Sequence, residues 1–185
     1  MAKRVRTVRS HTCGELRASH LDQEVTLCGW VAKRRDHGGV IFVDLRDRDG
    51  LTQIVFDPTL LAGAEALRSE YVLWCKGRVR NRPSGMTNAK MSTGEVEVTC
   101  TELVILSEAK TPPFVIEDET DALETTRLKY RYLDLRRPAL QKNLMVRHRM
   151  LSVVRNHLDA HRFTEVETPI LYKSTPEGAR DFIVP

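Results

Sequence analysis

Two neighbouring predicted strands carry residue types that can recognise the bases of single-stranded nucleic acid. In residues 40–46 every second side chain is apolar and is expected on the core face, which turns Phe42 outward. The basic run 33–35 and the amide of Gln53 are expected on adjacent strands. An exposed ring stacks on any base, whereas amide and guanidinium groups distinguish base edges. The pattern favours this stacking surface and a second reading, in which Phe42 covers a small secondary core, about equally.

The elements that would position these residues fit a small β-barrel. Residues 24–106 contain five strand-like runs, with one helix-like segment at 60–69 after the third run. Asp49-Gly50 between two apolar runs is a strong hairpin signal, and Gly29 inside the first run suits the bend that a barrel needs. Three strands, a helix and two strands are typical of the five-stranded barrel of the oligonucleotide-binding (OB) type. The predicted strands are 25–31, 40–46, 51–56, 71–79 and 95–106.

The rest of the chain differs in character. Residues 107–124 combine Pro112-Pro113 with many acidic side chains, which predicts a stiff, solvated linker. Pro138 can open a helix, and a short strand is expected at 163–167. An apolar stripe then covers about six helical turns and consists of Leu140, Leu144, Leu151, Val154 and Leu158. With so little to pack on this helix, we expect the truncated start of a larger α+β domain. The expected divisions are 1–106, 107–124 and 125–185.

Composition argues against several classes of protein. The 185 residues have a formal net charge of +4 and 41% apolar residues, without a run that approaches the ~20 apolar residues needed to span a bilayer. Four cysteines without a CxxC pair argue against a zinc site and against a disulfide scaffold. They favour reduced thiols in a cytoplasmic protein. The sequence lacks GxxxxGK[ST], GxGxxG and HExxH motifs, and we expect no metal site in it.

Several long motifs, in order along nearly the whole chain, resemble bacterial aspartyl-tRNA synthetases, which are class II enzymes. Residues 28–48 resemble their anticodon-binding domain. Residues 130–138 (Tyr-Arg-Tyr-Leu-Asp-Leu-Arg-Arg-Pro) resemble the segment that opens the catalytic domain, and 163–169 resemble class II motif 1. Residues 174–181 (Ser-Thr-Pro-Glu-Gly-Ala-Arg-Asp) resemble the loop that follows motif 1 in the aspartate enzymes. The sister lysine and asparagine enzymes differ in this loop and at 34–42.

The resemblance implies roles in reading a tRNA anticodon. Phe42 would stack in the anticodon loop, Gln53 would read the central uridine, and Arg35 would contact the third base. Glu97 matches a carboxylate that faces the first base, a guanine or its modified form. A carboxylate suits guanine because it accepts hydrogen bonds from the ring N–H and the amino group. Asn88, in the loop before Glu97, is implied to join this set.

The resemblance also implies a reaction and its partners. Aspartate would attack the α-phosphate of ATP to give aspartyl-adenylate, and the terminal ribose hydroxyl of tRNA would then take the aspartyl group. Glu177 matches the carboxylate that meets the ammonium group of aspartate. The ATP and Mg²⁺ sites are expected beyond residue 185, so we expect no catalytic residue in this chain and no activity from it alone. The motif 1 helix would form a homodimer or pack on the remaining part of the domain.

Two positions bear on which tRNA is accepted. His37 and Gly85 resemble the pair found in relaxed bacterial enzymes, which charge both aspartate and asparagine tRNAs. Discriminating enzymes carry a larger apolar residue and a lysine there. The two tRNAs differ at the third anticodon base, C or U, and a loop without the lysine imposes less selection on that base. We therefore expect the whole enzyme to attach L-aspartate to tRNA(Asp) and also to tRNA(Asn).

The barrel by itself also suits other functions. A stand-alone OB-fold RNA-binding module without catalysis would need nothing beyond it, and a paralogue could charge or modify another molecule. Residues 163–169 and 174–181 favour the enzyme over the module, because a pure binding protein has no use for an amino-acid pocket. We expect RNA, and neither DNA nor a membrane, as the partner.

Overall fold

The computed structural model describes residues 8–57, 63–171 and 173. The chain divides into two compact units, one that ends at Tyr130 and one that begins at Arg131. The first unit contains the predicted barrel and the second contains the predicted long helix. Each unit is described by itself.

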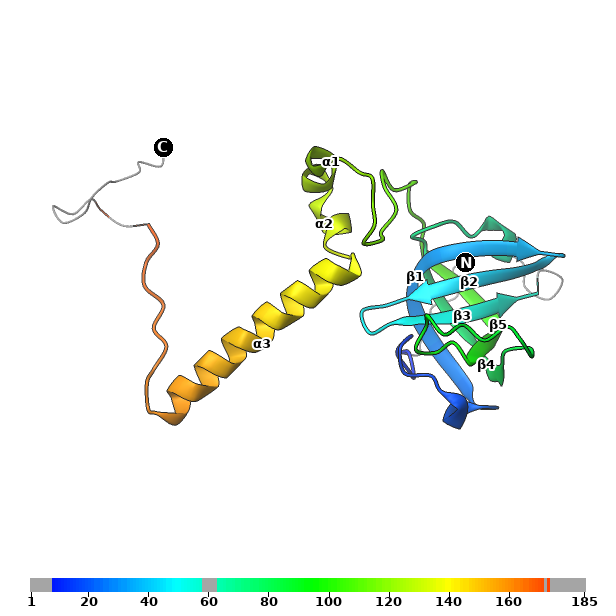
Figure 1. The fold of residues 1–185 in the computed structure, drawn as a ribbon, viewed down its shortest axis with the longest axis horizontal. Coiled ribbons are helices and arrows are strands. Elements are labelled where there is room, and N and C mark those ends of the chain that lie inside the picture. Colours follow the sequence, from blue (N-terminus) through cyan, green and yellow to red (C-terminus); the bar gives the residue numbers. More distant parts are fainter. Residues whose placement is uncertain (1–7, 58–62, 172, 174–185) are drawn as a thin grey trace. The chain divides into compact units, whose positions relative to one another are not determined.

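Five strands close into a barrel in the first unit (Figure 1). Their order around the barrel is β1-β2-β3-β5-β4, in which β5 runs parallel to β3 and the other pairs are antiparallel. Short 3-10 turns, η1 (Ala18–His20) and η2 (Ala64–Ala66), precede β1 and β4. The predicted five-stranded OB-type barrel is therefore confirmed. The strands are β1 (Glu24–His37), β2 (Val40–Arg46), β3 (Leu51–Phe56), β4 (Val72–Asn81) and β5 (Val96–Ser107).

Strand β1 is long enough to pair with two neighbours in succession. Residues 24–30 pair with β4, and residues 30–37 pair with β2. Gly29 lies just before this change of partner, where an added Cβ would be 2.4 Å from the carbonyl oxygen of Arg46. The close approach of the two backbones explains why glycine is required inside this strand.

The barrel interior is filled by alternate side chains of the strands. In β2 the predicted alternation is confirmed, because Ile41, Val43 and Leu45 have no exposed surface whereas Phe42 is only half-buried. The other strands and the segment before β1 complete one core cluster, which includes Cys13, Leu16, Leu27, Ile54, Phe56, Leu73, Val79, Val96 and Val98. The side chains between these core positions must face outward, and they form the surface described below.

The helix predicted at 60–69 is wrong for the part that the structure describes. Residues 58–62 lie outside the described residues, and residues 63–69 contain only the short turn η2. A 3-10 turn aligns side chains three positions apart, so Ala64 and Leu67 both join the core with no exposed surface. A single 3-10 turn therefore explains the spacing of Ala64 and Leu67 that had indicated a helix.

The segment after β5 is less solvated than its composition predicts. Its acidic residues Glu117, Asp118 and Glu119 are exposed, but Phe114 and Ile116 are buried. Helix α1 (Glu124–Lys129) follows and belongs to the same compact unit. Two apolar side chains therefore fix a stretch that proline and acidic residues alone would leave extended.

The second unit contains α2 (Arg131–Asp134) and α3 (Pro138–Ala160). The long helix predicted from Pro138 is confirmed, with the proline in its first turn. No residue of α3 is buried, and the predicted apolar stripe is between 42% and 48% exposed at Leu144, Leu151, Val154 and Leu158. Like every helix in the described ranges, α3 lacks the apolar length needed to cross a bilayer.

A buried carboxylate holds the beginning of the second unit. The side chain of Asp134 has no exposed surface and accepts hydrogen bonds from Arg131 and from Arg137, the latter at 3.0 Å. Two guanidinium groups satisfy the charge that burial would otherwise make costly. This ion triplet ties α2 to the first turn of α3.

The strand predicted at 163–167 is wrong. Within the part of the chain that the structure describes, these residues pair with no other strand. An isolated strand is not stable, because its hydrogen-bonding groups need a neighbour. The backbone N–H of Phe163 instead donates to the carbonyl of Leu158 at 3.1 Å, and Glu165 accepts two hydrogen bonds from Arg155. The chain therefore turns back on the end of α3.

The four cysteines form no disulfide. Cys13, Cys75 and Cys100 are buried, as expected, and Cys28 is half-buried. Burial, reinforced by Asp47, raises the pKa of the Cys13 thiol. A hydrogen bond with Cys100 and burial raise the pKa of the Cys75 thiol. These two thiols stay protonated near neutral pH and are poor nucleophiles.

Candidate nucleic-acid interface

One polar side chain from each of the five strands joins a continuous chain of hydrogen bonds on the outside of the barrel. Arg35 of β1 donates to Asp44 of β2 at 2.6 Å and to Oε1 of Gln53 of β3 at 3.3 Å. Nε2 of Gln53 donates to Glu97 of β5 at 2.8 Å. Arg80 of β4 donates to the other oxygen of Glu97 from Nε at 2.9 Å and lies within 2.8 Å of it through NH2. These five residues are called the polar network.

Strand register explains why these residues meet. Asp44 lies directly opposite Gln53 across β2 and β3, and Arg80 lies opposite Glu97 across β4 and β5. The parallel pairing of β3 with β5 then brings Gln53 alongside Glu97. Arg35 reaches Asp44 diagonally, because its direct partner across β1 and β2 is Phe42. Such directly opposed and diagonal positions are the ones at which side chains interact in sheets.

The carboxylates and the amide of the polar network are buried, whereas its two arginines are accessible. Glu97 is 1% exposed, Gln53 8% and Asp44 9%. The side chain of Arg80 is half exposed, and that of Arg35 is about a third exposed. Buried polar groups are costly unless they are hydrogen-bonded, and here each buried member has a partner in the network. The network is therefore a hydrogen-bonded polar layer from which two guanidinium groups reach solvent.

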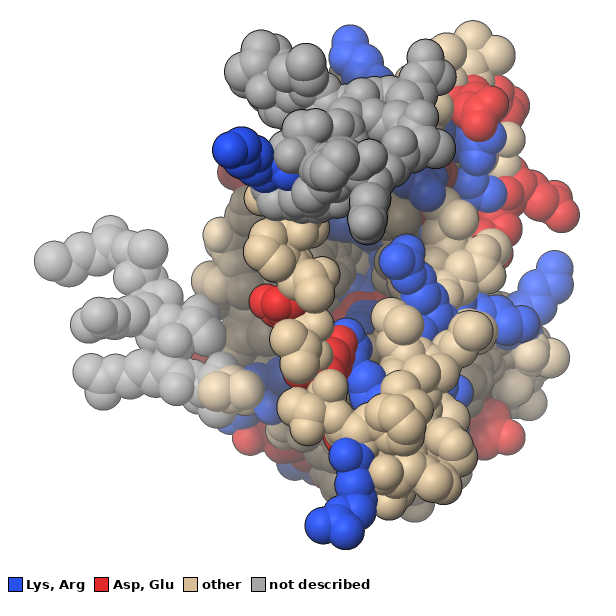
Figure 2. All heavy atoms as spheres, turned by 90° about the vertical axis from the view of Figure 1, so that its left-hand side faces the viewer, with Lys and Arg blue, Asp and Glu red and all other residues tan. Residues whose placement is uncertain are grey.

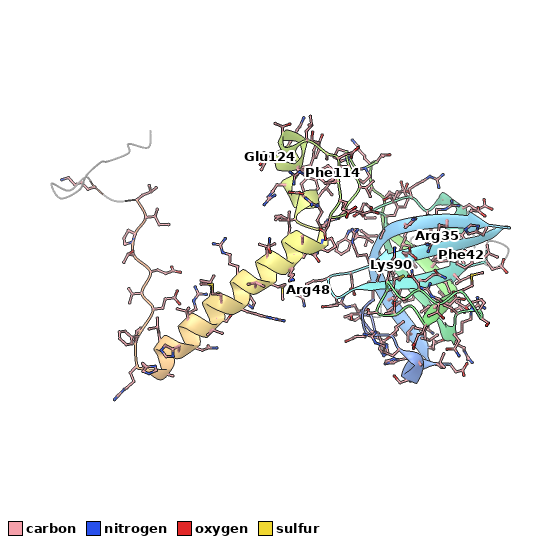
Figure 3. The ribbon with its side chains drawn as sticks, in the orientation of Figure 1. Arg35, Phe42, Arg48, Lys90, Phe114 and Glu124 are labelled. Carbon is pink, nitrogen blue, oxygen red and sulfur yellow. The ribbon has the colours of Figure 1, made fainter. Side chains whose placement is uncertain are left out.

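Phe42 lies beside this network and faces outward. It is half-buried and is directly opposed to Arg35 in the β1–β2 register (Figure 3). The ring of His37 approaches the ring of Phe42 edge-on, with 6.2 Å between their centroids. The assignment of Phe42 to the outer face is confirmed, because the ring is half-buried and does not belong to the core cluster of the barrel. An accessible ring next to a guanidinium group can stack on a base and bind its edge.

Arg82 adds a buried positive charge near the network. It is 9% exposed and donates to the carbonyl of Val96 at 3.2 Å and to the sulfur of Met91 at 3.6 Å. Burial lowers the pKa of its guanidinium, whereas the charges of Glu97 and Asp44 act to raise it. This cation adds one positive charge beside a network in which two arginines and two carboxylates otherwise balance.

The loop between β4 and β5 carries two more predicted positions. Asn88 is half-buried, and its side-chain oxygen accepts a hydrogen bond from the backbone N–H of Lys90 at 3.0 Å. Gly94 packs so closely on Asn88 that an added Cβ would be 1.9 Å from the carbonyl oxygen of Asn88. Gly85 is exposed, has φ of +79°, and has open space where a side chain would lie. Asn88 thus shapes the loop, and Gly85 leaves its outer part small.

The charged surface as a whole is mixed in sign. Figure 2 shows Lys and Arg side chains of the described residues interleaved with Asp and Glu on the face that it draws. A uniform basic patch therefore does not mark this face. The polar network and Phe42 therefore mark the candidate interface more specifically than net charge does.

The structure brings together most of the predicted site residues. Arg35, Phe42, Gln53 and Glu97 form one contiguous group on the outer side of the strands, with His37 at the ring of Phe42. Asn88 and Gly85 lie in the neighbouring loop, and Glu177 lies outside the described residues. The sequence argument missed Asp44 as a partner of Arg35, and it missed Arg80 and Arg82 altogether. Alternation with buried Val79 could have indicated that Arg80 faces outward.

Comparison with known protein families agrees with this geometry. Residues 25–106 match the OB-fold nucleic acid binding domain, and residues 123–185 match the class II tRNA synthetases of the D, K and N types. The chain therefore combines an anticodon-binding OB-fold with the start of a class II tRNA synthetase domain. The predicted fold class and family are therefore confirmed.

The chain is also similar in sequence to curated aspartate–tRNA(Asp/Asn) ligases. It is 59% identical to the ligase of Oleidesulfovibrio alaskensis and 55% identical to that of Desulfosudis oleivorans, in both cases over 181 residues. The alignments cover 96% of this chain and 30% of each relative. The chain thus spans about a third of the length of the curated relatives that it matches.

Solved structures support the same fold. Asparaginyl-tRNA synthetase from Pyrococcus horikoshii, complexed with asparaginyl-adenylate, gives a TM-score of 0.75 at 24% identity and covers 91% of this chain and 38% of that one. Aspartyl-tRNA synthetase from Entamoeba histolytica gives a TM-score of 0.77 at 20% identity and covers 86% of this chain and 39% of that one. At these identities the likeness establishes the fold alone.

Proposed function

We propose that this chain is the tRNA-reading part of an aspartate–tRNA ligase that accepts both tRNA(Asp) and tRNA(Asn). The observation that carries the proposal is the outward Phe42 beside a polar network in which Arg35, Gln53 and Glu97 are hydrogen-bonded side by side. The identity of 55–59% to ligases named for both tRNAs supports the choice of substrate. In domain terms the anticodon-binding part is 1–106, the linker is 107–124, and the start of the catalytic domain is 125–185.

Each member of the interface has a chemical role in this proposal. Phe42 stacks on a base of the anticodon loop, and Gln53 binds the edge of the central uridine through its amide. Arg35 donates to the third base, and Glu97 accepts from the first base, a guanine. Asn88 holds the adjoining loop in the shape that reaches the anticodon. The stacking supplies affinity for any base, whereas the polar groups supply the choice of sequence.

The relaxed choice between the two tRNAs rests on a small loop. Gly85 leaves open space in the β4–β5 loop, and the His37 ring makes a T-shaped contact with the Phe42 ring. A lysine at position 85 would bring a donor toward the third anticodon base, where tRNA(Asp) and tRNA(Asn) differ. With glycine there, C and U are accepted alike.

The whole protein, on this proposal, joins L-aspartate to the tRNA in two steps. The carboxylate of aspartate attacks the α-phosphate of ATP, which releases pyrophosphate and gives aspartyl-adenylate, and the terminal ribose hydroxyl of the tRNA then takes the aspartyl group. Glu177 would pair with the ammonium of aspartate. Among the described residues no cluster of three or more His, Cys, Asp or Glu could hold a metal ion. We propose that ATP and Mg²⁺ bind residues of the whole protein beyond position 185.

Two further features of the proposal concern assembly and location. The exposed apolar stripe of α3 supports self-association of the whole enzyme as a homodimer through the motif 1 helix. The free cysteines support a cytoplasmic enzyme, since thiols persist in reducing compartments.

Binding to RNA hairpins tests the proposal directly. The 185-residue chain should bind a labelled hairpin whose loop carries the triplet G-U-C more tightly than the same hairpin with the triplet reversed. A protein that merely binds any RNA would give equal affinities for both, and that result would favour the stand-alone RNA-binding module. Absence of binding to either hairpin would contradict both functions.

A further inference from the structure

Gln53 is held between a group that can only donate hydrogen bonds and a group that can only accept them. Arg35 donates to Oε1 of the Gln53 amide, and Nε2 of the same amide donates to Glu97. A guanidinium has no acceptor, and a carboxylate has no donor. If the amide turned over, its NH2 would face Arg35 and its oxygen would face Glu97, and both hydrogen bonds would be lost. Only one orientation of the Gln53 amide is therefore compatible with its neighbours.

The outer members of the polar network hold these two neighbours in place. Asp44 accepts from the same NH2 nitrogen of Arg35 that reaches Gln53, at 2.6 Å. Arg80 binds one oxygen of Glu97, which leaves the other oxygen for Gln53. Since Asp44, Gln53 and Glu97 are at most 9% exposed, water cannot readily replace these partners. The direction of the amide is thus set by residues from the other four strands.

The direction of the amide decides which pyrimidine it matches. After its two internal bonds, Gln53 retains one Nε2 hydrogen and one acceptor position on Oε1. Uracil presents a carbonyl acceptor next to a ring N–H donor, whereas cytosine presents an amino donor next to a ring nitrogen acceptor. The order of donor and acceptor on the two bases is reversed. An amide fixed in one direction matches one order, and an amide free to turn over matches both.

We propose that the polar network selects uracil over cytosine by fixing the direction of the Gln53 amide, with Arg80 and Asp44 as positioning residues. This inference rests on the proposed function, in which Gln53 reads the central base of the anticodon. Glu97 then has two effects, since it accepts from the first base and also orients the reader of the second base. Arg80 acts on the second base only through Glu97.

Binding of two RNA hairpins tests this arrangement. The hairpins differ only in the central loop base, G-U-C against G-C-C, and the readout is the ratio of their dissociation constants for the 185-residue chain. Wild type should bind the uracil hairpin more tightly by roughly tenfold or more, which corresponds to about 1.4 kcal/mol. Glu97→Gln places an amide against Gln53 and permits both directions, so the ratio should fall toward one. Arg80→Gln should lower the ratio less, and Arg80→Lys should restore part of it.

The control variant is Arg78→Gln on the same strand. Arg78 is exposed and lies two residues from Arg80, on the same side of β4, but makes no hydrogen bond to Glu97. Its loss should weaken both hairpins equally, because a cation that meets phosphate does not distinguish bases. A ratio that changes equally in Arg78→Gln and Arg80→Gln would overturn the positioning role of Arg80.

The outcomes separate this inference from the function on which it rests. If Glu97→Gln weakens both hairpins and leaves the ratio at its wild-type value, RNA reading stands and the orienting role of the network is wrong. If wild type binds neither hairpin, the proposed function fails and the inference fails with it. Should Glu97→Gln lose its cooperative unfolding transition, Arg80→Gln decides the matter, and an unchanged ratio in that folded variant overturns the inference.

Discussion

Arg35 and Phe42 lie directly opposite each other across β1 and β2, which places a guanidinium and an aromatic ring on the same outer face of the barrel. The flanking residues Ile41 and Val43 are fully buried on the other face. One strand therefore contributes to the core and to the interface with alternate side chains. The two properties can be tested separately, because removing an outward ring should affect binding far more than folding.

Replacing Phe42 with alanine should weaken RNA binding without unfolding the barrel. The loss in binding free energy to the G-U-C hairpin is expected to be ~1–3 kcal/mol, the usual contribution of one base stack. The free energy of unfolding should change little, because the ring is half-buried and lies outside the core cluster. Hairpin titration and urea denaturation measure the two quantities.

Phe56→Ala is the matched control for this variant. Phe56 is fully buried at the end of β3, so its removal should lower the free energy of unfolding by about 3–5 kcal/mol. Equal destabilisation by Phe42→Ala and Phe56→Ala would mean that Phe42 supports the core, and the stacking role would have to be abandoned.

Gly29→Ala should destabilise the barrel. The added methyl group would collide with the backbone carbonyl of Arg46, and neither strand can move without breaking ladder hydrogen bonds. We expect a loss of about 1–3 kcal/mol in the free energy of unfolding, typical of overpacking. Gly38→Asn is the control, since Gly38 has φ of +61°, which asparagine tolerates, and no atom within 4 Å of the new Cβ. Similar losses in both variants would contradict the steric explanation.

Asp134→Asn should destabilise the second unit. The substitution keeps the shape of the side chain but removes the charge that pairs with Arg131 and the buried Arg137. Loss of one partner from a buried ion pair typically costs about 3–5 kcal/mol. The change should appear as a lower melting temperature of the helical circular dichroism signal. Asp159→Asn removes an exposed carboxylate from the same unit and should leave that temperature nearly unchanged.

Charging assays with the whole enzyme test the choice of tRNA. The wild-type enzyme should attach aspartate to tRNA(Asp) and to tRNA(Asn). Replacing His37 with leucine and Gly85 with lysine should lower kcat/KM for tRNA(Asn) by roughly tenfold relative to tRNA(Asp), equivalent to about 1.4 kcal/mol. A wild-type enzyme that leaves tRNA(Asn) uncharged would rule out the relaxed specificity. Equal loss on both tRNAs in the variant would rule out the role of these two positions.

The sequence predicted the local features of the barrel well, because they depend on alternation within single strands. The bounds of β2 and β3 match the prediction, and so does the outward direction of Phe42. The long helix from Pro138 was predicted equally well, because the spacing of its apolar residues and the proline at its start both indicate a helix. Where spacing fits more than one structure, the prediction failed, and the turn at Ala64 and Leu67 is the example.

Features that depend on contacts between distant segments could not be predicted. Alternation indicates that Gln53 and Glu97 both face outward, but only the parallel pairing of β3 with β5 brings them together. The pairs that Arg80 and Asp44 make depend on strand register in the same way. The strand expected at 163–167 failed for a related reason, because a strand needs a partner that the described residues do not supply.

The position of β5 between β3 and β4 has a consequence for how the molecule is made. Until residues 96–107 have been synthesised, β3 and β4 each present an unpaired edge, which is the kind of surface that promotes association between nascent chains. Arrival of β5 closes both edges and delivers the carboxylate of Glu97 at the same time. Closure of the barrel and completion of the polar network thus depend on the same strand, and because its pairing joins segments distant in the sequence, we expect this step to be slow.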